Sequence, residues 1–148
     1  MDRIEISDKM GLYTFAWDEG RSEELRTMFT EDAVFETWAP RKESLFYKFG
    51  SLEEIVGGHK ALGAQVSGDM AVRHNLSEVT FLELTEKTAK TKTVYTFSMF
   101  MQTDLNVPTL IVSGSFNDSW VKTDQGWLIK NREIIYDNMP PIITDMLQ

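Results

Sequence analysis

The sequence contains no cysteine and only two histidines, His59 and His74. The lack of cysteine excludes disulfides, thiolate nucleophiles and thiolate metal sites, and two histidines cannot form a three-histidine metal site. No apolar run approaches the roughly 20 residues that a membrane helix needs. The segment Met1–Glu5 holds two acids and no apolar stretch, so we expect no secretory signal and a cytoplasmic protein.

Basic residues are few: 15 Lys and Arg stand against 23 Asp and Glu, which gives a net charge of −8. Such a surface repels a phosphate backbone, so we expect neither nucleic acid nor a membrane as partner. The 148 residues are 42% hydrophobic and 26% charged, which is typical of one folded domain. With only four prolines and no linker, we expect a single domain over 1–148, with a C-terminal tail from about 138 to 148.

Apolar residues in the first half follow a helical spacing. Ile6, Met10, Tyr13 and Trp17 are four, three and four residues apart, which predicts one helical stripe. Gly20 suits the end of this helix. A short second helix is expected from Ser22 to about Met28 and a third from Ser51, separated by a strand over 33–38 and an irregular, aromatic-rich stretch over 39–50.

The second half alternates apolar and polar residues, which predicts strands. We expect strands over 89–102, from about 110 to 120 and over 127–136, and one over 72–83 whose apolar parity shifts at a bulge near Ser77 and Glu78. Helices followed by long antiparallel strands predict an α+β domain. One face of a strongly curved sheet would then wrap the helices and leave a cavity at its open end.

Asp118 is a polar residue on an apolar face, because its parity places it between Phe116 and Trp120. A buried carboxylate is costly unless it is hydrogen-bonded or lines a solvated cavity. Two interpretations stay open: a structural acid that holds a backbone donor or Arg132, or an acid of a functional cavity.

The histidines are the candidates for proton transfer near neutral pH. His74 begins a strand within Arg73-His74-Asn75, and Asp18 ends the first helix. Asp18 is an ordinary solvated acid unless it pairs with a base. His59 follows two glycines on the third helix and is expected to face solvent; the glycines lack the pattern of a phosphate-binding loop.

Several segments together resemble SnoaL-like domains of the nuclear transport factor 2-like superfamily. These segments are Tyr13…Ala16-Trp17-Asp18…Gly20, Glu24-Leu25…Met28 through Val34, Gly58-His59-Lys60-Ala61-Leu62, Arg73-His74-Asn75, Gly114 through Asp118, Gly126-Trp127-Leu128-Ile129 and Arg132. The resemblance spans nearly the whole chain. It implies a cone-shaped α+β barrel, with N-terminal helices packed in a strongly curved, mixed and mainly antiparallel sheet.

The resemblance also implies site residues. Asp18 and His74 match the aspartate and one histidine of the scytalone dehydratase pattern, in which the carboxylate orients the imidazole. The second histidine of that pattern is missing, since the matching region offers only Gln102, and Thr37 or Trp38 replaces its tyrosine. Tyr13 matches the oxyanion tyrosine of ketosteroid isomerase, but the position of that enzyme's base falls on Thr37.

The preferred hypothesis is an acid/base enzyme of the dehydratase, isomerase or polyketide cyclase type, which needs no metal or organic cofactor. Asp18 would fix the tautomer of His74, whose Nε2 would exchange the proton with a small cyclic or hydrophobic hydroxy or carbonyl compound. Tyr13 or Tyr95 would stabilise an oxyanion. The pocket walls would be Trp17, Trp38, Phe97, Phe116 and Trp120, with Thr37 and Asp118 as polar lining.

Two alternatives belong to other classes: a protein that binds a small hydrophobic ligand without chemistry, and a structural subunit that resembles the small subunit of a dioxygenase. A homodimer is expected, as in similar proteins. The discriminating feature is whether Asp18 and His74 are in hydrogen-bond contact at a cavity.

Overall fold

The computed structural model describes residues 1–65, 70–101 and 110–140. Two α-helices, α1 (Asp2–Asp18) and α2 (Leu52–Gln65), and two 3₁₀ helices, η1 (Ser22–Thr27) and η2 (Pro40–Lys42), accompany one sheet. Its strands are β1 (Phe29–Trp38), β2 (Leu45–Phe49), β3 (Met70–Leu76), β4 (Thr80–Leu84), β5 (Thr88–Met101), β6 (Leu110–Thr123) and β7 (Gly126–Tyr136).

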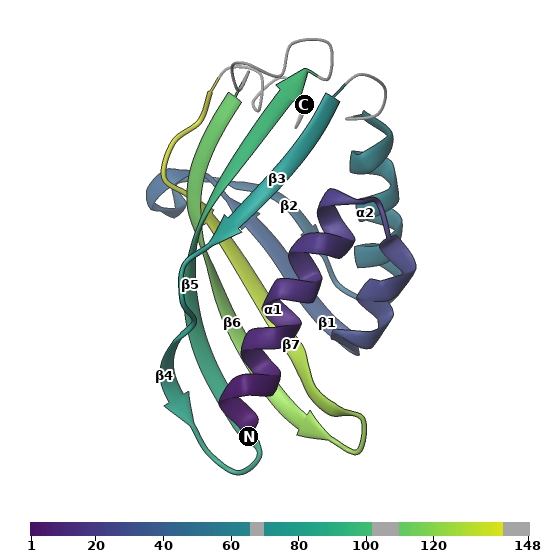
Figure 1. Ribbon diagram of the computed structural model, residues 1–148, viewed down its shortest axis with the longest axis vertical. Helices are drawn as coiled ribbons and strands as arrows, with labels where there is room; N and C mark the ends of the chain where they lie inside the picture. Colours follow the sequence, from purple (N-terminus) through teal and green to yellow (C-terminus); the bar gives the residue numbers. More distant parts are fainter. Residues whose placement is uncertain (66–69, 102–109, 141–148) are drawn as a thin grey trace.

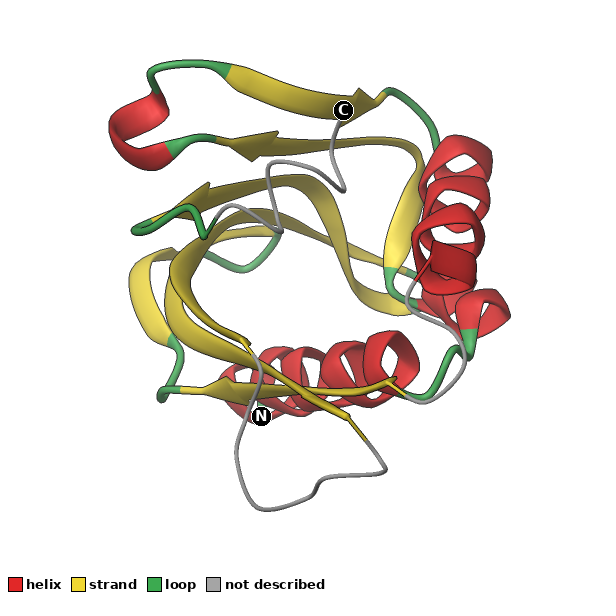
Figure 2. Ribbon diagram, turned by 90° about the horizontal axis from the view of Figure 1, so that it is seen from above, coloured by secondary structure: helices red, strands yellow, loops and turns green. Residues whose placement is uncertain are grey.

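The sheet is mixed and mainly antiparallel. Its strand order is β2-β1-β7-β6-β5-β3, and β4 also pairs with β5; only β1 and β7 run parallel. The long strands curl around an interior that α1 and α2 close from the other side (Figures 1 and 2). The predicted α+β cone, with helices packed in a strongly curved sheet, is confirmed.

The first helix forms as its apolar spacing predicts, and its end has a defined geometry. Ile6, Met10 and Tyr13 are buried against the sheet. At the C-terminus the amide of Arg21 donates to the carbonyl of Ala16 (2.8 Å) and that of Gly20 to the carbonyl of Trp17 (3.4 Å). This pair of bonds is a Schellman motif, and it needs the left-handed backbone of Gly20, whose φ is 69°. The chain therefore turns away directly after Asp18.

Two predicted segments differ from the structure. Residues 39–50 are not irregular throughout, because Leu45–Phe49 form strand β2, paired with β1 alone at the edge of the sheet. A short edge strand of this kind has no long apolar alternation to predict it. The expected strand over 72–83 is two strands, β3 and β4, that both pair with β5. The parity shift near Ser77 and Glu78 marks the break between them rather than a bulge within one strand.

Apolar side chains of the helices and the concave sheet face form the core. Strand β6 contributes Val112, Phe116 and Trp120 on one face, as its alternation predicts, and Asp118 is buried on the same face. The indole N–H of Trp120 donates to the hydroxyl of Thr91 at 2.9 Å, which satisfies the polar atom of this buried ring. Trp120 is therefore a core residue.

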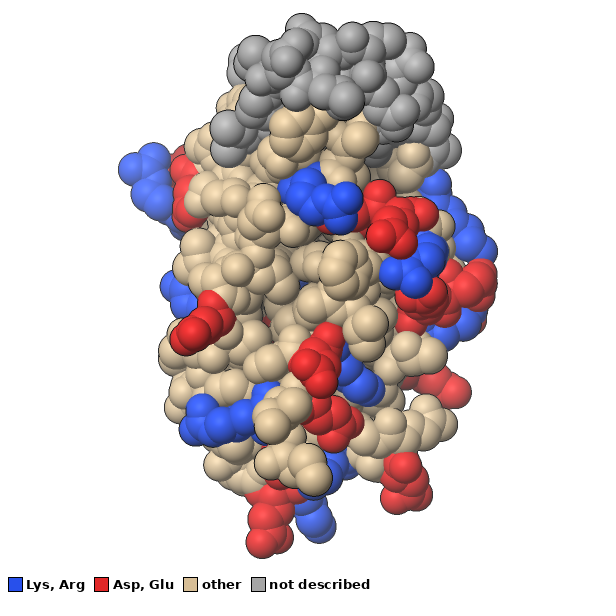
Figure 3. All heavy atoms as spheres, viewed as in Figure 1, with Lys and Arg blue, Asp and Glu red and all other residues tan. Residues whose placement is uncertain are grey.

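Opposite charges lie side by side over η1 and α2 (Figure 3). Arg26 pairs with Glu23 at 2.7 Å and with Glu53, and Lys60 pairs with Glu23. These pairs are exposed and screened by solvent, so they contribute little to the stability of the fold. Among the residues described, no helix is long and apolar enough to cross a membrane. Of the predicted tail, residues 141–148 lie outside the described part of the chain.

Candidate functional site

Asp18 and His74 are joined by two hydrogen bonds, although 56 residues separate them in sequence. The Asp18 carboxylate lies at the end of α1, where that helix crosses the edge strand β3. Its Oδ1 is 2.6 Å from Nδ1 of His74, and its Oδ2 accepts from the backbone N–H of His74 at 2.9 Å. Both side chains are buried, with 1% and 5% of their surface exposed. The predicted contact between these two residues is present.

The tautomer of His74 follows from this geometry. A carboxylate only accepts, so Nδ1 carries the proton and Nε2 is left as the basic nitrogen. No side chain in the described ranges forms a hydrogen bond with Nε2. Burial lowers the pKa of His74, and Asp18 opposes that shift, so the imidazole is neutral at pH 7. A neutral imidazole with a free Nε2 can accept a proton from carbon or oxygen.

Three aromatic rings surround the His74 imidazole. The ring centroids of Phe97, Tyr95 and Trp17 lie 4.7, 5.8 and 6.3 Å from that of His74. Burial raises the pKa of Tyr95 well above its usual value, so its hydroxyl stays a hydrogen-bond donor. Part of the predicted site thus forms one cluster between α1, β3 and β5, made of Asp18, His74, Trp17, Tyr95 and Phe97.

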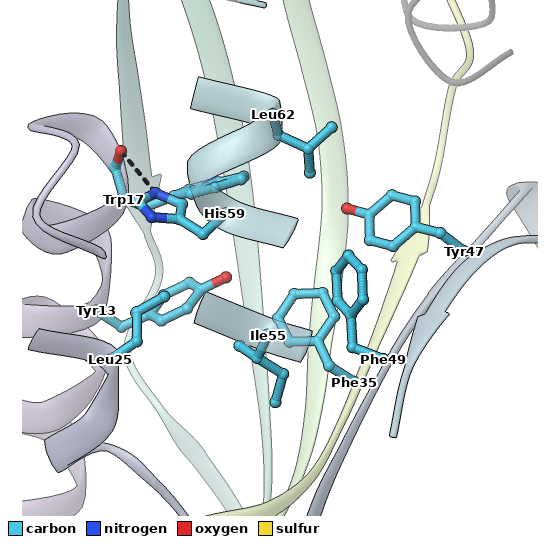
Figure 4. A pocket seen from close by; sticks show the side chains of 9 residues that line it. All are labelled: Tyr13, Trp17, Leu25, Phe35, Tyr47, Phe49, Ile55, His59 and Leu62. Atoms are coloured by element: carbon cyan, nitrogen blue, oxygen red, sulfur yellow. Dashed lines mark hydrogen bonds between the residues drawn. The ribbon is translucent and has the colours of Figure 1, made fainter. Parts of the chain in front are cut away.

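A narrow pocket opens next to this cluster, between α1, α2 and β2 (Figure 4). As the side chains stand, it has room for about one water molecule. The hydroxyls of Tyr13 and Tyr47 point into it from opposite walls (Figure 4). Burial raises the pKa of both phenols, so each remains a donor at neutral pH. The lining residues are Tyr13, Trp17, Leu25, Phe35, Tyr47, Phe49, Ile55, His59 and Leu62.

Only two of the predicted pocket residues, Tyr13 and Trp17, line this pocket. Thr37 is fully buried beside Tyr47, its partner across the β1–β2 ladder. Trp38 lies on the other face of β1, where its indole N–H donates to Glu36 at 3.1 Å and Lys42 sits over the ring. Phe116 stacks on Tyr95 and meets Tyr13 edge to face within the core. Gln102 falls outside the described residues.

Of the two interpretations of Asp118, the contacts support the structural one, in which this acid holds Arg132. Its two oxygens accept from Nε and Nη2 of Arg132, each at 2.8 Å, and both side chains are fully buried. The guanidinium carbon lies 4.0 Å from the ring centroid of Tyr13 and 4.6 Å from that of Phe116. Although burial disfavours the charge, Asp118 keeps the pKa of Arg132 above its ordinary value. The core thus holds an ion pair packed against aromatic rings.

The prediction that His59 faces solvent is wrong. His59 is 4% exposed and lines the pocket, because it continues the buried stripe of α2 formed by Leu52, Ile55 and Val56. The spacing of three, one and three residues along this stripe indicates that His59 is buried. The prediction went wrong because a polar histidine was expected on the exposed face of the helix. Tyr47 was missed as well, because the short edge strand that carries it gave no pattern.

The burial of His59 makes stability depend on pH. Burial lowers its pKa to about 4, although the Trp17 carbonyl opposes the shift. The unfolded chain, with a pKa near 6.5, therefore binds more protons than the folded chain between pH 4 and 6.5, so stability falls as pH falls through this window. We expect wild type to lose on the order of 1–2 kcal/mol more than His59→Gln between pH 7.5 and pH 5 in urea unfolding. Equal losses would contradict the buried neutral state.

The family model described as "SnoaL-like domain" matches residues 1–133. The chain belongs to the SnoaL-like domain family. No functionally curated protein matches the sequence. The resemblance that the sequence motifs suggested is therefore confirmed at the level of the family.

Solved structures similar to this SnoaL-like domain share its fold. The beta subunit of a candidate aromatic-ring-hydroxylating dioxygenase from Novosphingobium aromaticivorans has a TM-score of 0.76 at 18% identity, covering 91% of this chain and 88% of that one. A candidate scytalone dehydratase from the same organism has 0.70 at 22%, covering 90% and 82%. An NTF2-like superfamily protein from Salmonella enterica has 0.70 at 12%, covering 95% and 94%. One fold thus carries different named roles.

The described residues contain no group of three or more His, Cys, Asp or Glu side chains placed to hold a metal ion. Among the described residues, the polar groups of the His74 cluster and of the pocket are Asp18 and His74, the hydroxyls of Tyr13, Tyr47 and Tyr95, and the imidazole of His59.

Proposed function

We propose that this SnoaL-like domain is an acid/base enzyme of the dehydratase, isomerase or cyclase type. Its substrate would be a small cyclic or hydrophobic compound with a hydroxyl or carbonyl group. The observation that carries the proposal is the 2.6 Å contact of Asp18 with Nδ1 of a buried His74 whose Nε2 is unpaired among the described residues.

The chemistry follows from the tautomer. Nε2 of His74 removes a proton from the carbon next to a carbonyl, and the electron pair of that C–H bond forms an enolate. The imidazolium so formed is stabilised by Asp18. In a dehydration, it returns the proton to a hydroxyl on the neighbouring carbon, which leaves as water; in an isomerisation, it returns the proton to another carbon. No cofactor is required for either path.

The surroundings favour such a substrate. Trp17, Tyr95 and Phe97 present flat apolar faces around His74, which suit a planar ring. Tyr95 is a protonated donor whose ring centroid lies 5.8 Å from that of the imidazole, and we assign it the binding of the enolate oxygen. The substrate would contact Trp17, which borders both His74 and the pocket.

The test is proton exchange, because it needs the base alone. Wild type is incubated in D₂O with a panel of cyclic ketones and hydroxy-ketones, and mass spectrometry follows deuterium uptake next to the carbonyl and loss of water. We expect His74→Gln to lose about 10²–10⁴-fold of the rate. The exposed neighbour Asn75→Ala, on the same strand, is the control and should keep it. A His74→Gln variant that works at the wild-type rate contradicts the proposal.

One observation favours a second function, the binding of a small hydrophobic ligand without chemistry. Neither Asp18 nor His74 is among the residues that line the pocket of Figure 4, which is mainly aromatic. If panel compounds bind but none exchanges or loses water, and His74→Gln binds them equally well, this second function is the better one.

A further inference from the structure

His59 is a buried titratable group that the proposed reaction does not use. It comes from α2 and, like His74, lies against Trp17: the ring centroids of Trp17 and His59 are 4.0 Å apart, and those of Trp17 and His74 are 6.3 Å apart. Trp17 is thus a neighbour of both histidines of the chain. The residue that follows Trp17 is Asp18, whose carboxylate orients His74.

Both ring nitrogens of His59 have partners. Nε2 lies 3.3 Å from the carbonyl oxygen of Trp17, and Nδ1 lies 2.6 Å from the hydroxyl of Ser22. A carbonyl can only accept, so Nε2 carries the proton and Nδ1 accepts from the Ser22 hydroxyl. This single neutral tautomer ties α2 to the end of α1 and to the start of η1.

The bond to Trp17 falls at the position where α1 stops. The Trp17 carbonyl belongs to the last turn of α1, where no helical N–H four residues further along can bond it. The bond that it accepts from the N–H of Gly20 in the Schellman motif is long, at 3.4 Å. His59 supplies this oxygen with a second donor and covers the adjoining indole ring. The last turn of α1 is thereby fixed in direction, and Asp18 belongs to that turn.

We propose that His59 is a positioning residue, which holds Trp17 so that the Asp18 carboxylate meets Nδ1 of His74. The inference rests on the proposed function where it concerns turnover, but the placement of Asp18 can be measured without it. His59 touches no reacting atom in this scheme. Its effect passes through the Trp17 carbonyl and ring to the next residue.

Two substitutions separate the two hydrogen bonds of His59. The amide nitrogen of Gln reaches about as far as Nε2 and can still donate to the Trp17 carbonyl. The shorter Asn side chain reaches only to the position of the His59 Nδ1. His59→Asn therefore keeps the contact with the Ser22 hydroxyl and loses the one with the Trp17 carbonyl. We expect His59→Gln to stay within about threefold of wild-type kcat and His59→Asn to lose about 10- to 100-fold, with KM changed much less.

The second readout is nuclear magnetic resonance of ¹⁵N-labelled His74. In wild type the Nδ1–H proton, held by Asp18, should give a strongly downfield signal. We expect this signal to persist in His59→Gln and to move or broaden in His59→Asn at a temperature where both variants are folded. Leu62→Ala, which trims the same pocket on the same helix, is the control and should leave the signal in place.

The outcomes distinguish the two proposals. If wild type turns over no compound but the His74 signal changes in His59→Asn alone, the positioning role stands and the proposed reaction fails. If the signal and kcat of His59→Asn match those of wild type, or if only its melting temperature falls, His59 is a packing residue and the inference is overturned.

Discussion

Asp18→Asn is expected to lower kcat by up to about 10⁴-fold in any reaction that uses His74 as base, while the protein stays folded. The amide nitrogen of Asn donates where the carboxylate accepted, so the imidazole either rotates or adopts the tautomer with the proton on Nε2. The nitrogen that must accept the proton is then already protonated. The shape of the side chain is nearly unchanged, so ligand affinity should be retained.

The measurement is the deuterium exchange assay with the best compound of the panel, beside a binding titration of the same compound. His74→Gln and the double variant Asp18→Asn/His74→Gln should be as slow as Asp18→Asn alone, because residues that act as one unit are not additive. If the double variant loses much more than either single variant, the two residues act separately and the dyad is wrong.

Asp118→Ala is expected to lower the free energy of unfolding by about 3–5 kcal/mol, because it leaves the buried charge of Arg132 without a partner. The guanidinium has no exposed surface and cannot regain water without opening the core. Urea denaturation followed by fluorescence measures the change. The Asp118→Ala protein that remains folded should keep the wild-type activity per molecule.

The matched control removes both charges. Asp118→Leu/Arg132→Met replaces the ion pair by apolar side chains of similar size, and it should be clearly more stable than Asp118→Ala. If Asp118→Ala unfolds at the same urea concentration as wild type and instead abolishes turnover, Asp118 is a reacting group, and its structural role in the core ion pair is wrong.

The sequence predicted those parts of the fold in which one periodicity runs over a long element. The stripe of α1 and the alternation of β6 each bury one face, so the burial of Tyr13 and Asp118 could be read from spacing alone. Strand β2 could not be predicted in this way, because a short edge strand paired on one side shows no sustained alternation. Tyr47 was missed together with its strand.

The candidate site was predictable only through resemblance. Nothing in local spacing brings Asp18 to His74, because their contact depends on how α1 crosses β3. His59 shows the opposite error: its spacing placed it on the buried face of α2, and an expectation about residue type overrode that pattern. The pairing of its two nitrogens, with Ser22 and Trp17, explains how a histidine is accommodated there.

The second bond between Asp18 and β3 has a consequence for the edge of the sheet. Strand β3 ends one side of the sheet order, and an exposed edge of this kind can template pairing with another chain. The carboxylate that orients the imidazole also occupies the outward N–H of His74, at 2.9 Å, and α1 lies along that edge. Because Asp18 occupies this N–H, that position of the edge cannot bond a further strand, so Asp18 fastens the end of α1 to the sheet as well as orienting His74.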